Sequence, residues 1–446
     1  MWERMSYYGM RGIFILYLTS AMAVGAFGWS SMSDAEIQAN ALSFLGTFMF
    51  MVYVTPVIGG YLADNFLGQR KSVIIGGVIM ALGQFALGTP HEYIQGMEKT
   101  FLYLGLALLI IGNGFFKPNI STLVGDLYKP GDHRRDQAFT IFYMGINVGS
   151  TMGFLVVGTI GEKIDFQLGF IAAGIGMLLS LVVQLLFAQK YLGDLGREPV
   201  NKKTKEQAAQ PKIPLTSIEK DRIKAILMMS FFTIIFFMGF EQAAGVLTLF
   251  AKNHTDLIIF GWEMPASWLQ VVNPLFIVIL APAMAKLWMG LGDRDPSTPK
   301  KFSLGMLFLG LGFVSMVGAA MQISDGGKAA IWWLVVMYIL HTIGELCLSP
   351  IGLSMVTKLS PVRYVSFMMG MWFFFTAIGN YLAAVAGMIV GEAGPLVTFA
   401  GVAIFCLLAG GVLHLLSDKI VVWMHGADDT PEVDEELLEK ELSVVT

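Results

Sequence analysis

The amino-acid sequence predicts an all-α membrane protein with twelve transmembrane helices in two six-helix bundles. Three observations support this fold class. Of the 446 residues, 55% are hydrophobic and 14% are charged, and the mean hydropathy of +0.66 is too high for a soluble chain of this length. Apolar runs long enough to cross a bilayer recur along the chain. One polar interval divides these runs into two sets of six.

Each predicted span is an apolar run of about 18 residues or more, the length that a helix needs to cross the hydrocarbon core. The spans are 4–26, 38–62, 71–90, 98–125, 137–160, 167–190, 223–250, 265–288, 302–322, 329–357, 364–391 and 395–418. The first run is long, contains polar residues and lacks a small-residue cleavage site, so we expect no cleavable signal peptide.

The polar interval 193–222 is rich in Lys, Gln and Pro and is too polar to enter the bilayer. It has too few large apolar residues to form a folded domain, so it predicts a cytoplasmic linker. The bundles are then residues 1–192 and 223–419. Residues 420–446 form an acidic cytoplasmic tail, which is typical of a solvated end, although a short helix is an alternative.

The distribution of Lys and Arg predicts the orientation in the membrane. Twenty of these residues lie in or beside the connections after even-numbered spans. The connections after odd-numbered spans hold four: Lys99, Lys163, Lys252 and Lys328. Both termini are therefore expected in the cytoplasm. Because the basic residues are dispersed over loops, nucleic-acid binding has no support, and Cys347 and Cys406 lie in apolar runs, which indicates no disulfide framework.

The first span carries a polar stripe formed by Glu3, Arg4, Tyr7, Tyr8 and Arg11. Positions 4, 7, 8 and 11 share one face of a helix. Lipid offers a guanidinium group no partner, and a charge near the bilayer centre costs about 2.5–3.5 kcal/mol. The stripe therefore predicts a polar lining that faces protein or water. The alternative is that these residues snorkel at the membrane surface.

Polar residues also recur inside other spans at helical spacing. They are Asn113 and Lys117 before Pro118; Tyr143, Asn147 and Ser150; Glu241 and Gln242; Gln270 and Asn273 before Pro274; and His341, Glu345 and Ser349. Pro118 removes a backbone hydrogen bond and predicts a bend beside the lysine.

Charges inside the membrane are segregated by half. Arg11 and Lys117 lie in the first half, whereas Glu241 and Glu345 lie in the second. If the halves face each other across a cavity, closing one end brings opposite charges together, and protonation or a charged substrate releases them. The alternative is a set of static ion pairs that lock the bundle.

The same groups suit a zwitterionic substrate. An extended dipeptide spans roughly 7 Å between its charged ends and a tripeptide roughly 10 Å. Cations on one wall and a carboxylate on the other can hold both ends, while aromatic side chains accommodate varied substrate side chains. The aromatic candidates are Tyr7, Tyr8, Tyr53 and Trp372. Recognition of the ends alone would give broad specificity.

Buried carboxyl groups are the candidate proton carriers, because protonation switches their charge inside the membrane. They are Glu3, Glu241 and Glu345. His341 is a further candidate, against the alternative that it is an ordinary packed core residue.

The connection GGYLADNFLGQRKS resembles the G-x-L-A-D-x-x-G-R-K loop of the major facilitator superfamily. Asp64 and the Arg70/Lys71 pair are expected to bond helix ends on the cytoplasmic side.

Further segments match the motifs of one family within that superfamily: WERMSYYGMR, YVTPVIGGYLAD, FFKPNIST, FTIFYMGINVGS, FEQ at 240–242, PASWLQVVNPLF and GELCLSPIGLS. They resemble the proton-dependent oligopeptide transporter family, whose first-helix motif is E-x-x-E-R-F-x-Y-Y-G. The resemblance implies the major facilitator fold and proton-coupled uptake of di- and tripeptides. It also implies a bacterial inner (plasma) membrane location and no cofactor besides the proton gradient.

The resemblance also implies roles for individual residues. The proton-coupling residues would be Glu3, Arg4, Glu241 and Glu345. The groups that hold the peptide carboxylate would be Arg11 and Lys117, and those that hold its amino end Asn147, Asn273 and Glu345. The aromatic lining would be Tyr8, Tyr53, Tyr143 and Trp372. The gating pairs would be Arg11 with Glu241 and Lys117 with Glu345.

Two departures from the family pattern stand out. The first Glu of E-x-x-E-R would fall before Met1, so the chain is expected to begin partway into the motif. The interval 193–222 has no room for the two extra helices that bacterial members often carry between the halves.

Other functions remain as alternatives. The nearest is proton-coupled transport of another small anion or zwitterion, such as nitrate or a modified amino acid. An intramembrane enzyme is disfavoured, because the sequence has neither the H-E-x-x-H nor the G-x-S-x-G motif. A channel is disfavoured because the buried charges form no repeated ring.

Overall fold

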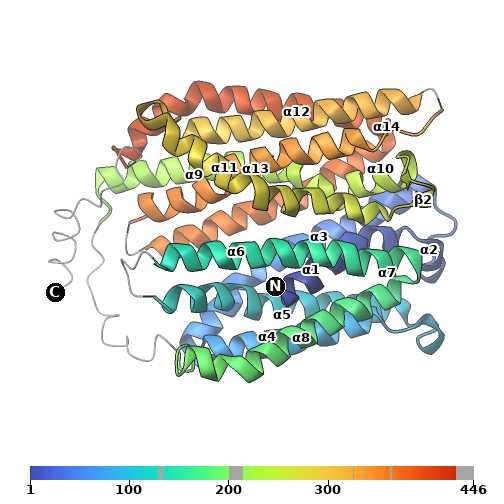
Figure 1. The fold of residues 1–446 in the computed structure, drawn as a ribbon. Coiled ribbons are helices and arrows are strands. Elements are labelled where there is room, and N and C mark those ends of the chain that lie inside the picture. Colours follow the sequence, from blue (N-terminus) through green and yellow to red (C-terminus); the bar gives the residue numbers. More distant parts are fainter. Residues whose placement is uncertain (129–133, 200–213, 325, 362–363, 428–446) are drawn as a thin grey trace.

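The computed structural model describes residues 1–128, 134–199, 214–324, 326–361 and 364–427. In these ranges the chain is almost entirely helical, and Figure 1 shows long helices lying side by side. The strands found there are β1 (Ile258–Ile259) and β2 (Trp262–Glu263), which form a short antiparallel hairpin. The hairpin and the short helix α2 (Ala21–Ala26) lie at the same end of the molecule, called here the hairpin end (Figure 1).

Eleven helical stretches in the described residues are long and apolar enough to cross a membrane. The remaining predicted span contains α1 (Trp2–Leu18), which has 17 residues and is buried along almost its whole length. The predicted span 4–26 is wrong as a single helix. The chain breaks at Thr19 and Ser20, and the Ser20 hydroxyl caps α2 by accepting from the Ala23 N–H at 3.3 Å.

The other helices before the linker are α3 (Asp34–Leu62), α4 (Gln69–Leu87), α5 (Glu98–Asp126), α6 (Arg134–Met152), α7 (Gly158–Lys163) and α8 (Phe166–Leu192). Short π-helical segments, η1 (Ala63–Leu67) and η3 (Gly153–Val157), extend α3 and join α6 to α7; the 3₁₀ turn η2 (His91–Tyr93) precedes α5. Glycines let these helices approach closely, as membrane bundles require. A Cβ on Gly59 would lie 2.0 Å from the Gly114 carbonyl oxygen, so α3 and α5 touch through their backbones.

The elements after the linker are α9 (Ser217–Phe240), η6 (Glu241–Ala244), α10 (Val246–His254), η7 (Ala266–Val271), α11 (Val272–Leu291), η8 (Gly292–Arg294), α12 (Thr298–Ser324), α13 (Trp332–Leu359) and α14 (Val365–Met424). A capping box of Thr216 and Glu219 starts α9. The long helix α14 contains a break at Gly394, whose φ of 81° is left-handed, and this break separates the last two spans.

The predicted span 223–250 is not one continuous helix. The α-helix ends at Phe240, and the chain makes a tight 3₁₀ turn through Glu241 and Gln242 before α10 begins. Apolar residues flank the Glu241–Gln242 pair on both sides, so the hydropathy of the segment predicts one span and does not reveal the turn. The turn places the Glu241 side chain at a break between two helices.

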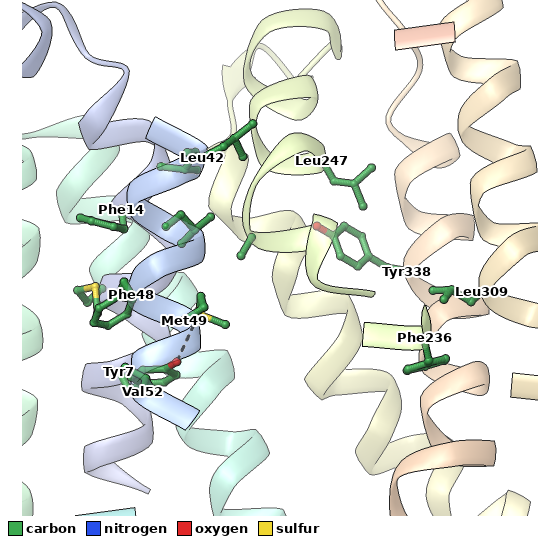
Figure 2. Close-up of a cluster of buried hydrophobic side chains, with 14 of the residues drawn as sticks. Tyr7, Phe14, Leu42, Phe48, Met49, Val52, Phe236, Leu247, Leu309 and Tyr338 are labelled. Atoms are coloured by element: carbon green, nitrogen blue, oxygen red, sulfur yellow. Dashed lines mark hydrogen bonds between the residues drawn. The ribbon is translucent and has the colours of Figure 1, made fainter. Parts of the chain in front are cut away.

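Contacts between early and late elements position the site. α3 packs against α14, where Gly46 meets Ala384, and α6 packs against α11. Figure 2 shows the apolar side chains nearby, with Tyr7 and Phe48 on one side and Phe236 and Leu309 on the other. Tyr7 is buried in this core, and its hydroxyl group donates to the Met49 sulfur at 3.6 Å.

The predicted division at 193–222 stays a prediction, and residues 200–213 lie outside the described part of the chain. The tail was predicted to begin at residue 420, but α14 continues to Met424 because Ile420 and Met424 are buried. Residues 428–446, where a short acidic helix was an alternative, also lie outside the described residues.

Candidate functional site

A central cavity lies among α1, α3, α6, α9, α11 and α13, with η3, η6 and η7 closing its wall. Its empty space is ≈ 810 Å³ including the part that is open to solvent. The polar and aromatic lining residues are Tyr8, Arg11, Tyr53, Tyr143, Asn147, Ser150, Glu241, Gln270, Asn273, Tyr338, His341 and Glu345. Most of the predicted site residues are therefore brought together, although they come from helices far apart in the sequence.

The pair of Arg11 and Glu241 spans the cavity wall between α1 and η6. The Arg11 guanidinium donates to the Glu241 carboxylate, and the two side chains are only 9% and 6% exposed. Attraction between opposite charges is strong where water is excluded, and removal of either partner leaves the other buried and unpaired. The contact joins an early and a late helix, as the sequence predicted for this pair.

Another part of the cavity lining carries Glu345 on α13 and Asn273 on α11. The Asn273 amide donates to the Glu345 carboxylate at 2.8 Å and to the Thr342 hydroxyl at 3.1 Å. This arrangement fixes the direction of the carboxylate and leaves it with further acceptor capacity. The structure shows no ion pair between Glu345 and a basic residue in the chain ranges that it describes.

Lys117 lies on α5 in a different environment. Its ammonium group is 3.7 Å from the centre of the Tyr53 ring, a cation–π contact. The predicted pairing of Lys117 with Glu345 is not formed in this conformation, since each group has another partner. The lysine is not among the residues that line the central cavity, but Tyr53 is, so the two are neighbours across one ring.

Glu3 and Arg4 pair with each other on α1, with the guanidinium Nε 2.9 Å from the carboxylate. Both are buried, but neither lines the central cavity. The Arg4 side chain packs near Gly149, where a Cβ would come within 3.0 Å of it, so this pair lies between α1 and α6. Because both side chains are buried, they do not snorkel to the membrane surface, which was the alternative for this stripe.

Some predicted lining residues have other surroundings. Trp372 is 3% exposed and packs against the Phe302 ring at 6.1 Å, and a Cβ on Gly352 would lie 2.4 Å from its indole. It is not a cavity-lining residue in this structure, because its bulk fills the core between α12, α13 and α14. The predicted aromatic lining is therefore reduced to Tyr8, Tyr53 and Tyr143.

Asn147 and His341 line the cavity but have contrasting contacts. The Asn147 amide donates to the Tyr143 carbonyl of its own helix at 2.9 Å, which leaves its oxygen as an acceptor. His341 packs against the Phe313 ring at 5.0 Å, and in the described chain its ring nitrogens have no hydrogen-bond partner. His341 thus combines a packed position with access to the cavity.

A contact that sequence reasoning missed lies at the hairpin end. The Glu162 carboxylate accepts from the backbone N–H groups of Ala266 at 2.8 Å and Ser267 at 2.9 Å, which caps η7. The Trp268 indole donates to the Thr159 hydroxyl at 2.9 Å. These bonds join an early to a late segment. No sequence signal marks them, because the acceptor of a backbone N–H depends only on the fold.

The helical stretches and the buried polar cavity define this chain as an integral membrane protein. The POT family (PTR2) matches residues 70–194 and 199–394, and the chain belongs to this family, a family of transporters. The resemblance inferred from the motifs is thereby confirmed.

Known relatives and structures agree. The chain is 36% identical to "Uncharacterized transporter YclF" of Bacillus subtilis (strain 168), over 95% of this chain and 93% of that protein. It is 31% identical to "Di-/tripeptide transporter" of Lactococcus lactis subsp. cremoris, over 95% and 94%. The crystal structure of peptide transporter POT in complex with sulfate superposes with a TM-score of 0.85 at 33% identity, covering 95% of this chain and 93% of that one. The predicted major facilitator fold is confirmed.

Proposed function

We propose that this protein is a proton-coupled symporter that imports di- and tripeptides by alternating access around the central cavity. Relatives across nearly the whole chain are named di-/tripeptide transporters, and a similar solved structure is a peptide transporter. The observation that carries the proposal is the arrangement of charges. A buried cation paired with its carboxylate and a second, amide-oriented carboxylate line the same cavity.

The peptide would lie across the cavity with its amino group at Glu345, Asn273 and Asn147. A protonated amine requires hydrogen-bond acceptors, and Glu345 and the Asn147 oxygen are acceptors. Asn273 orients the Glu345 carboxylate. The peptide carboxylate would point toward Arg11 and Lys117.

Proton coupling would use the competition for Arg11. While Glu241 is ionised, it holds the guanidinium and keeps α1 against η6. A proton on Glu241 removes its charge, so Arg11 becomes available to a peptide carboxylate and the two elements can separate. Glu345, Glu3 and Arg4 would take part in later proton steps. No cofactor is needed, since the proton gradient supplies the energy.

The orientation follows from the basic residues of the connections. We place the hairpin end outside the bacterial inner membrane and both chain ends in the cytoplasm. In this mechanism the charged groups inside the membrane bind protons and peptide and break no covalent bond of a substrate, which favours a transporter over an intramembrane enzyme. The contact of Arg11 with Glu241 would then close the outer side in this conformation.

Transport in liposomes tests the proposal. Wild-type protein should accumulate labelled di- and tripeptides, but not tetrapeptides, when the outside is acidic, and a protonophore should abolish accumulation. Glu345→Gln should impair peptide binding or proton-driven uptake, whereas Glu263→Gln on the exposed hairpin should match wild type. Normal gradient-driven uptake by Glu345→Gln would remove this residue from the mechanism, and uptake insensitive to the gradient would refute symport.

A small anion or a modified amino acid is the other candidate substrate, and the names of the relatives do not favour it. Competition separates the two. Unlabelled tripeptide should displace labelled dipeptide, and nitrate should not. Product formation by purified protein in detergent, without a gradient, would instead revive the enzyme alternative.

A further inference from the structure

Asn380 on α14 is a buried polar residue that the mechanism above does not use. Asn380 is 2% exposed, and within the described chain neither its amide oxygen nor its amide nitrogen has a hydrogen-bond partner. Burying such a group unpaired costs about 1–3 kcal/mol. The amide therefore requires a partner that can both donate and accept.

A small cavity beside Asn380, called here the rear cavity, has space for that partner. Its lining residues are Leu42, Leu45, Gly46 and Met49 of α3; Glu241, Gln242 and Ala244 of η6, with Gly245; and Asn380, Ala383 and Ala384 of α14. Figure 2 shows Leu42 and Met49 on α3 in this region. The Gln242 amide nitrogen already donates to the carbonyls of Met238 and Ala383, so the lining side chains that can bind water are Asn380, the Glu241 carboxylate and the Gln242 amide oxygen.

Glu241 lines both the rear cavity and the central cavity. On its other side, the rear cavity adjoins an outer vestibule of ≈ 800 Å³ at the hairpin end. The two spaces share Leu42, and the vestibule continues along the same elements through Val246 and Gly387. Leu42 therefore joins the vestibule to the rear cavity, and Glu241 joins the rear cavity to the central cavity.

We propose that Asn380 binds a water molecule in the rear cavity and that this water conducts protons from the outer vestibule to the Glu241 carboxylate. The proposal rests on the proposed symport function, because it gives the proton a route that the peptide does not share. In the transfer, an O–H bond of the protonated water breaks and a new O–H bond forms on the Glu241 carboxylate. Asn380 is a positioning residue and does not itself change charge.

The groups around Glu241 are consistent with this direction of transfer. The titratable groups that act on it come from four elements: Arg11, Tyr7 and Tyr8 of α1, Tyr53 of α3, Lys117 of α5 and Glu345 of α13. Arg11, Tyr8, Tyr53 and Glu345 also line the central cavity, whereas Tyr7 donates to Met49 of the rear-cavity lining. On the rear side, the described lining holds no titratable group besides Glu241, and the nearest in the vestibule are Asp34 and His254. A proton that has passed Asp34 and His254 in the vestibule meets no further titratable group in the described rear-cavity lining before Glu241.

The substitution Asn380→Leu tests the route, since it removes the amide and fills the space with apolar atoms. In liposomes, pH-gradient-driven peptide uptake should fall roughly tenfold, the equivalent of about 1.4 kcal/mol in a barrier. Peptide counterflow without a gradient should stay near wild type. Asn380→Ser, which still binds water, should restore uptake. The control is Thr376→Val, one turn earlier on α14, whose hydroxyl donates to the Trp372 carbonyl of its own helix at 3.1 Å.

The outcomes are distinguishable. If wild-type protein shows no gradient-driven uptake, the proposed function fails; if wild type is gradient-driven and Asn380→Leu is equally so, the water route fails. A high-resolution structure of the wild-type protein gives a second test that does not depend on folding of a variant. It should show ordered water within hydrogen-bond distance of the Asn380 amide, and a dry rear cavity would overturn the proposal.

Discussion

Substitution of Glu241 by Gln should open the hairpin end of the protein. The Arg11 guanidinium, whose side chain is 9% exposed, loses the charged partner that it has within the described chain. Removing one partner of a buried ion pair costs about 3–5 kcal/mol. Because the pair joins α1 to η6, this cost falls on the closed conformation and not on one in which the elements separate. The equilibrium should shift toward separation by about a hundredfold or more.

Thiol accessibility measures this shift. The two native cysteines, Cys347 and Cys406, are buried and free, so both can be replaced by Ala to give a silent background. Leu42→Cys then places a thiol between the vestibule and the rear cavity, at a position only 3% exposed. A membrane-impermeant reagent should modify this thiol much faster in the Glu241→Gln variant.

The double variant Arg11→Gln with Glu241→Gln is the control for unpaired charge. It removes both ions, so its modification rate should rise less than in the single Glu241→Gln variant. Two results would refute the reasoning that the ion pair holds α1 against η6. One is an unchanged modification rate in Glu241→Gln. The other is a modification rate in the double variant that exceeds the sum of the rates in the two single variants.

Three further substitutions have expected results. Lys117→Gln should raise the peptide concentration for half-maximal uptake by about 10–100-fold, because a charged hydrogen bond worth about 1.5–3 kcal/mol is lost. C-terminally amidated peptides should bind equally weakly to the wild-type and variant proteins. An unchanged concentration for half-maximal uptake would contradict the role of Lys117 in holding the peptide carboxylate. Glu162→Gln should lower the free energy of unfolding by about 1–3 kcal/mol in denaturant titrations, because the cap of η7 loses a charged acceptor; no change would show that the cap is not stabilising. Lys163 donates to Glu263 and lowers the pKa of that carboxyl, so the contact holds at neutral pH and weakens as the pH falls through the lowered pKa. Because the Glu263 side chain is 56% exposed, Glu263→Ala should lower the free energy of unfolding by less than about 1 kcal/mol. A larger loss of stability would contradict the exposed geometry.

Hydropathy and charge predicted most of the architecture. Uninterrupted apolar runs give spans because every backbone group in lipid must bond within its own helix. Local breaks were harder to foresee. The turn at Glu241 and the gap at Thr19 and Ser20 lie on short polar pairs inside long apolar runs, and such pairs also occur within continuous helices, so only tertiary packing decides where the helix ends.

The sequence also identified which polar residues gather at the cavity, because an ion inside a span must face protein or water. It did not identify their partners. Lys117 contacts Tyr53 and not Glu345, since pairing depends on which ends of the bundle are closed. Trp372 was misplaced because an aromatic residue in a span suits a core as well as a pocket. Glu162 was missed because its partners are backbone N–H groups.

The position of a bound dipeptide is the most direct test of the central claim. A high-resolution cryo-EM structure with a dipeptide at saturating concentration should show it in the central cavity. Its amino group should lie within hydrogen-bond distance of Glu345 and Asn273, and its carboxylate should point toward Arg11 and Lys117. A dipeptide bound outside this cavity, or in the reverse direction, would contradict the assignment of the two walls.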